Sequence, residues 1–114
     1  MKYIRTEDGI YEPDGETDDG RLLLVKVKGG WNYLPKQPIL KQAGTIEQLC
    51  DEFVGIRKSD HKAYTGKLDG YWFEETNGWL GRLDKYEIIY GAIWTDKGLI
   101  YVAKMNNKGK FELL

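Results

Sequence analysis

The chain has almost none of the side chains that enzymes use as nucleophiles and bases. It contains one cysteine, one histidine and one serine, which are Cys50, His61 and Ser59. Nucleophilic catalysis needs a nucleophile and a base that converge from separate elements. Ser59, Asp60 and His61 are consecutive, and adjacent side chains diverge in an extended chain, so this trio is expected to be structural or solvent-exposed. No catalytic residue is predicted, and the chain is expected not to be an enzyme.

The same scarcity excludes several other kinds of site. A single cysteine cannot form an internal disulfide, and one cysteine with one histidine is too few for a structural zinc site. Phosphate-binding glycine loops are absent, so no cofactor is expected. The longest apolar run, residues 88–94, is far shorter than the roughly 20 residues of a membrane span. No signal peptide is visible, and a cytoplasmic protein that does not contact a membrane is predicted.

The composition favours a small globular protein rich in strands and turns. Hydrophobic residues make up 41% and charged residues 31% of the 114 residues, with a net charge of −1. Glycine occurs 14 times and proline only 3 times, as expected for tight turns between strands. One domain over residues 1–114 is predicted. The near-zero net charge supplies no global attraction for nucleic acid.

The expected fold class is α+β, a mostly antiparallel β-sheet with one short helix packed on it. An N-terminal hairpin is predicted over residues 2–6 and 10–12, around the turn dipeptide Asp8-Gly9. A C-terminal three-stranded meander is predicted over residues 86–95, 99–105 and 110–114. Residues 56–70 are expected to form a loop. Residues 71–75 and 79–83 are interpreted as a second hairpin, with a short amphipathic helix as the alternative.

The helix is predicted at residues 45–54. Thr45 is a suitable N-cap, and Gln48 stands where a capping box needs it. The apolar positions recur at helical spacing and end before Gly55, a common terminating residue. Cys50 lies on this apolar stripe and is therefore expected in the core, where burial keeps a thiol inert.

An acidic segment near the N-terminus is the first candidate binding surface. The residues assigned to partner binding in this segment are Glu12, Asp14, Glu16, Asp18 and Asp19. Three of them alternate like the start of an EF-hand loop, but Val25 stands where that loop needs a glutamate. No metal site is therefore assigned. An ordinary solvated loop, weak divalent-ion binding and contact with a basic protein surface are the alternatives.

An aromatic segment supplies the second candidate surface. Tyr71, Trp72 and Trp79 are assigned to partner binding, because exposed aromatic rings framed by charges are typical of protein-recognition surfaces. The alternative is that Trp72 packs under a loop. In an extended segment Tyr71 and Phe73 share a face and Trp72 takes the opposite one.

A small basic cluster offers a different function. Arg57, Lys58 and Lys62 lie near aromatic residues in the sequence, and such interleaving can bind single-stranded nucleic acid. Nucleic-acid binding is the second hypothesis. The third is an enzymatic or small-molecule site that uses carboxylates such as Glu74 and Glu75.

Two stretches resemble a known group of proteins. The stretches ILKQAGTIEQLCDEFV (39–54) and YGAIWTDKGLIYVAKMN (90–106), with the opening MKYIRTEDGIYE (1–12), are similar to small uncharacterised accessory proteins of Gram-positive bacteriophages and conjugative elements. The resemblance covers somewhat under half of the chain and assigns no site residue. It implies a mobile-element protein in a bacterial cytoplasm. The leading hypothesis is a non-enzymatic protein that binds a host protein or protein–nucleic-acid complex, such as a CRISPR defence component.

Overall fold

Strands dominate the structure. The computed structural model describes residues 2–114, and strands account for 58% of the residues against 5% in helical turns. Every strand pair whose register the structure defines within residues 2–114 is antiparallel, and the strands belong to two sheets. The predicted α+β class is therefore wrong, because the chain folds as an all-β protein. No helix within residues 2–114 is long and apolar enough to cross a membrane.

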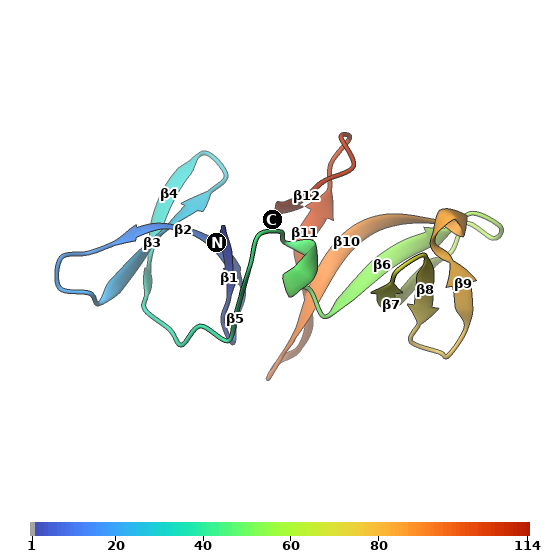
Figure 1. The fold of residues 1–114 in the computed structure, drawn as a ribbon, viewed down its shortest axis with the longest axis horizontal. Helices are drawn as coiled ribbons and strands as arrows, with labels where there is room; N and C mark the ends of the chain where they lie inside the picture. The colour runs from blue at the N-terminus through green and yellow to red at the C-terminus, as the bar shows by residue number, and fades with distance from the viewer. Residues whose placement is uncertain (1) are drawn as a thin grey trace. The chain divides into compact units, whose positions relative to one another are not determined.

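The residues cluster into two compact units, which we describe separately. The N-terminal unit holds the chain up to Leu49 together with Leu113 and Leu114. Its sheet has the order β4-β3-β2-β1-β5 (Figure 1). The strands are β1 (Tyr3–Arg5), β2 (Ile10–Glu16), β3 (Leu22–Val27), β4 (Gly30–Pro35) and β5 (Lys41–Ala43). The predicted hairpin of β1 and β2 is confirmed, while the single domain over residues 1–114 stays a prediction.

The C-terminal unit, Cys50–Glu112, carries the seven-stranded sheet. The strand order is β12-β11-β10-β6-β7-β8-β9. The predicted meander is confirmed as β10, β11 and β12, and β10 is visibly bent in Figure 1. The strands are β6 (Glu52–Arg57), β7 (Ala63–Asp69), β8 (Trp72–Glu75), β9 (Leu80–Arg82), β10 (Tyr86–Thr95), β11 (Gly98–Met105) and β12 (Phe111–Leu113).

The predicted helix at 45–54 does not form. A single 3-10 turn, η1 (Glu47–Leu49), occupies its first half, and β6 begins at Glu52. Ten residues make a helix that is marginal without tertiary support. Phe53, Val54 and Ile56 gain more as a central strand between β7 and β10, which supply backbone partners on both sides. Tertiary pairing therefore overrides the local helical pattern.

The predicted loop at residues 56–70 is also wrong, because β7 runs through it. Gly66 sits in the middle of this strand, and glycine normally weakens a strand. A Cβ atom at this position would collide with the carbonyl group of Glu74 on the neighbouring strand β8. Glycine is needed here for close backbone approach, a requirement that the sequence alone does not reveal.

Aromatic rings fill the core of the C-terminal unit. Phe53, Phe73 and Tyr86 form its buried centre, with Phe73 fully inaccessible to solvent. The ring centroids of Phe73 and Tyr86 are 4.5 Å apart, and those of Phe53 and Phe111 are 5.5 Å apart. The Tyr86 hydroxyl of this core donates a hydrogen bond to the buried Glu75 carboxylate, which is described below.

Replacing Gly66 by alanine tests the close approach of β7 and β8. We expect Gly66→Ala to lower the free energy of unfolding by about 2 kcal/mol, because backbone atoms must shift. Gly44→Ala is the matched control, since a Cβ there meets nothing within 4 Å. Urea denaturation of both variants measures the difference. Equal stability of the two variants would contradict the packing described here.

Candidate functional site

The β8–β9 hairpin places three aromatic side chains at the surface of the C-terminal unit. Its strands pair Trp72 with Arg82 and Glu74 with Leu80, which confirms the hairpin interpretation over the helix alternative. We call residues 71–82 the aromatic hairpin. Its exposed apolar side chains are Tyr71, Trp72, Trp79 and Leu80, at 80%, 42%, 60% and 55% relative exposure.

These aromatic rings lie on two faces of the hairpin. The register places Trp72 with Glu74 and Leu80 on one face, and Phe73 with Glu75 on the other. The predicted opposition of Trp72 and Phe73 is confirmed by their exposures of 42% and 0%. Trp79 lies on the Glu75 face, where its carbonyl oxygen accepts the Glu75 N–H at 2.8 Å. The hairpin therefore offers two aromatic contact points and not one patch.

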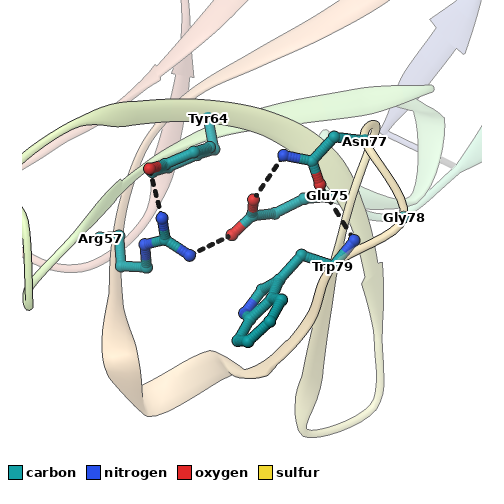
Figure 2. A pocket seen from close by; sticks show the side chains of 6 residues that line it. All are labelled: Arg57, Tyr64, Glu75, Asn77, Gly78 and Trp79. Carbon is teal, nitrogen blue, oxygen red and sulfur yellow. Dashed lines mark hydrogen bonds and ion pairs between the residues drawn. The ribbon is translucent and has the colours of Figure 1, made fainter.

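An open cavity of about 740 Å³ lies beside Trp79 (Figure 2). Strands β6, β7 and β8 and the loop that joins β8 to β9 contribute its walls. Its lining residues are Arg57, Tyr64, Glu75, Asn77, Gly78 and Trp79. The loop is held by the Asn77 side chain, whose Oδ1 accepts the Trp79 N–H at 2.9 Å. The main chain of Trp79 is therefore held by hydrogen bonds on both its N–H and its carbonyl oxygen.

A buried carboxylate organises this cavity. The Glu75 side chain is 1% exposed and pairs with the Arg57 guanidinium at 3.4 Å. Its oxygens also accept the Tyr86 hydroxyl and the Asn77 side-chain amide, the latter at 3.2 Å. Arg57 continues to Asp60 at 2.8 Å and donates to the Tyr64 hydroxyl. A burial this complete is stable only with such compensation.

The hydrogen bonds within this network shift the pKa values of several of its members. Hydrogen bonding to Asp60 raises the pKa of Arg57, and the Arg57 hydrogen bond holds the pKa of Asp60 well below its usual value. Burial, together with the hydrogen bond to Glu75, raises the pKa of Tyr86 to about 12. These shifts favour the charged forms of Arg57 and Asp60 and the neutral form of the Tyr86 hydroxyl.

Two arginines of this region, Arg57 and Arg82, also lie over aromatic rings. The Arg57 guanidinium lies 4.1 Å from the Tyr64 ring centroid and 6.0 Å from that of Trp79. Arg82 lies 5.9 Å from the Trp72 ring centroid on the other face. Such cation–π contacts restrain exposed rings at little entropic cost on binding.

The predicted basic cluster does not assemble into a free surface. Arg57 is engaged by two carboxylates, and the Lys58 ammonium donates to the Asp84 carbonyl oxygen at 3.0 Å. Lys62 is exposed in the turn before β7. The hypothesis of nucleic-acid binding is therefore weakened, because Arg57 is already paired with Asp60 and Glu75.

The acidic segment has a different form from the predicted loop. Glu12, Asp14 and Glu16 lie on β2, and only Asp18 and Asp19 lie in the turn after it. Glu12 lies 3.6 Å from Lys2 and 3.9 Å from Lys26, and Glu16 lies 2.8 Å from Lys36. Lysines of the same unit therefore pair with two of the five acidic residues, Glu12 and Glu16.

Trp31 on β4 is a surface residue that the sequence interpretation missed. Its indole N–H donates to the Asp14 carboxylate at 2.9 Å, and its side chain is 61% exposed. Alternation along β4 gave the available signal, because Trp31 and Tyr33 share one face of an edge strand. The N-terminal unit therefore carries its own aromatic and acidic surface.

The remaining sequence candidates lie apart from the cavity. Cys50 packs against the aromatic core, where its sulfur would lie 2.6 Å from a Cβ at Gly91. Ser59 and His61 are exposed in the turn after β6, while the Asp60 carboxylate belongs to the Arg57 network. Within residues 2–114 no group of three or more His, Cys, Asp or Glu side chains is placed to hold a metal ion.

A second cavity, of about 310 Å³, is lined in part by the same loop and shares Glu75 and Gly78 with the first. Its most buried acidic side chains are Glu75 and Glu52, and Glu52 begins strand β6. A helix over residues 45–54 would have put Glu52 opposite the apolar stripe, and its burial follows from the change to strand. Glu74 and Glu75, which the sequence offered as enzymatic carboxylates, both line this cavity.

Removing the arginine tests the dependence of Glu75 on its partner. We expect Arg57→Met to lower the thermal midpoint by roughly 10 °C, because a buried carboxylate loses its cation. Adding Glu75→Gln to that variant should restore part of the loss, since the uncompensated charge disappears. Differential scanning calorimetry measures both. A double variant less stable than Arg57→Met would contradict the assignment.

The raised pKa of Tyr86 predicts a loss of stability at high pH. The unfolded chain ionises this tyrosine near its ordinary pKa of 10 and the folded chain only near 12. Stability from Tyr86 is therefore intact below pH 10 and is lost as pH rises toward 12, by about 1 kcal/mol at pH 11. Urea denaturation of the Tyr86→Phe variant should show a shallower decline over this window. Tyr11, whose pKa burial also raises to about 12, contributes equally to both proteins.

Comparison with known proteins adds no relative to this geometry. No family model matches the chain, and no curated protein or solved structure matches it. The resemblance to accessory proteins of mobile elements stays a prediction. The function must therefore be inferred from the surfaces and cavities of the chain itself.

Proposed function

We propose that this chain is a non-enzymatic binding module that recognises a host protein through the aromatic hairpin. The supporting observation is that Trp79 is 60% exposed while its backbone N–H is held by Asn77 and the Arg57 guanidinium lies 6.0 Å from its ring centroid. Tryptophans held in place before binding are typical hot spots of protein interfaces. The resemblance implies a mobile-element protein in a bacterial cytoplasm, and the proposal adds that it inhibits a host defence system such as CRISPR.

The acidic surface of the N-terminal unit has a secondary part in this proposal. Glu12 and Glu16 are paired with lysines, and such surface pairs contribute little affinity. Asp14, Asp18 and Asp19 are exposed and have no lysine partner among residues 2–114. Charges of this kind chiefly change association rates and the choice of partner. The hydrophobic anchor is therefore assigned to the hairpin and the electrostatic steering to Asp14, Asp18 and Asp19.

An enzymatic reading has less support. The polar side chains of the larger cavity are hydrogen-bonded to one another, with Glu75 committed to Arg57, Asn77 and Tyr86. A general acid or base needs a proton within reach of a substrate and a pKa suited to transferring it. The network instead has the form of a support for Trp79.

Affinity capture from a Gram-positive host lysate, read out by mass spectrometry, tests the proposal. We expect a host protein retained by the unaltered chain to be reduced at least tenfold by combined Trp72→Ala and Trp79→Ala. Tyr101→Ala is the matched control, because Tyr101 is a 51% exposed aromatic of the same unit outside the hairpin. Retention of the same proteins by all three chains, or of none by any, would contradict the proposal.

A further inference from the structure

The smaller cavity contains a buried carboxylate that lacks a cation. Glu52 is 5% exposed, and one oxygen accepts the Thr76 hydroxyl at 2.9 Å while the other accepts the Trp94 indole N–H. Both donors are neutral, and no ion pair reaches Glu52 from any of residues 2–114. Glu75, by contrast, is buried to a similar degree and has its arginine.

A buried carboxylate without a counter-charge is energetically costly. Two neutral hydrogen bonds reduce this cost but leave the charge uncompensated in a poorly solvated site. A carboxylate offers about four acceptor positions, of which Thr76 and Trp94 use two. Glu52 can therefore accept two further N–H groups from a ligand that also supplies a positive charge.

The surroundings of Glu52 favour a cationic ligand. Glu52, Glu74 and Glu75 line the cavity together with one cation, Lys67, but the Glu75 carboxylate is already paired with Arg57, so two glutamates remain against one lysine. The Trp94 side chain is among the walls. Its volume of about 310 Å³ is at the lower end of the range for ligand pockets. Such a space suits one side chain better than a whole cofactor. An indole ring beside carboxylates is a favourable environment for a guanidinium group.

We propose that this cavity binds an arginine side chain of the protein partner. A guanidinium is planar, presents paired N–H donors and stacks on an indole, so it matches the two free acceptor positions and the wall of the cavity. A lysine ammonium would supply the charge without the paired donors. This inference rests on the proposed function, since it names the chemistry of one partner residue.

The position of the cavity fits such a role. The loop 76–78, which leads into Trp79, lines both the cavity beside Trp79 and the Glu52 cavity. A partner that packs on Trp79 could therefore place an arginine across the loop. Trp79 would supply apolar contact area and Glu52 would supply charge recognition.

Titration with Nα-acetyl-arginine amide, followed by amide chemical shifts in NMR, tests the inference. We expect saturable binding with a Kd of about 1 mM, with shifts concentrated at Glu52, Thr76 and the Trp94 indole. Nα-acetyl-citrulline amide, the neutral isostere, should bind at least tenfold more weakly. No saturation, or equal binding of the two compounds, would overturn the inference. Tighter binding of Nα-acetyl-lysine amide would overturn the choice of arginine.

Three variants sharpen this measurement. Glu52→Gln removes the charge while keeping the shape, and it should weaken arginine binding about tenfold. Lys67→Ala removes the competing cation at an exposed position and should strengthen binding about threefold, a readout that does not depend on altering a buried residue. Asp69→Asn, an exposed carboxylate of the same strand as Lys67, is the control and should change nothing. An unchanged Kd in both Glu52→Gln and Lys67→Ala would overturn the assignment.

The outcomes separate this inference from the proposed function. If a captured host protein is lost with the tryptophan variants but retained by Glu52→Gln, the arginine pocket is refuted and the binding module stands. If arginine amide saturates the cavity but no host protein is ever retained, the proposed function is refuted.

Discussion

The ion pair between Arg57 and Glu75 is the interaction on which the rest of the C-terminal unit depends. It joins the end of β6 to the end of β8, and the Tyr86 hydroxyl brings the start of β10 into the same cluster. The Glu75 carboxylate is buried and bonded to Tyr86 of the aromatic core, so its charge must be compensated from within the protein. The compensated Glu75 carboxylate also accepts the Asn77 side-chain amide, and Asn77 in turn accepts the Trp79 N–H in the loop. Folding and the proposed recognition therefore share one set of side chains.

Much of the strand pattern could be predicted from the sequence. The turn dipeptide Asp8-Gly9 and the apolar run of β10 are local signals, and both lead to strands where the structure has them. The helix could not be corrected locally, because Thr45 and Gln48 do interact, at 3.0 Å, within a single turn. The turn ends because β6 pairs with β7 and β10. A short window of sequence around the turn does not contain both of these strands.

The candidate site was predictable only in part. The aromatic segment was identified from composition, because Tyr71, Trp72 and Trp79 are too many large rings for a simple turn. The buried carboxylates were not, since Glu52 and Glu75 look in sequence like ordinary surface residues beside Asp51 and Glu74. Glu75 is buried because β8 alternates exposed and buried side chains, whereas Glu52 is buried because the central strand β6 is covered on both faces. The position of Glu75 therefore follows from the same register that buries Phe73.

Both edges of the C-terminal sheet are very short. Strands β9 and β12, which end the sheet, have three residues each. So few unpaired backbone groups give poor templates for the addition of another strand, and self-assembly into fibrils is disfavoured. A partner that cannot add a strand to the sheet has to be recognised by side chains. Rigid frameworks whose loop residues vary recognise their partners in this way. Replacement of single residues in the loop 76–79 would then redirect specificity while the framework beneath it is conserved.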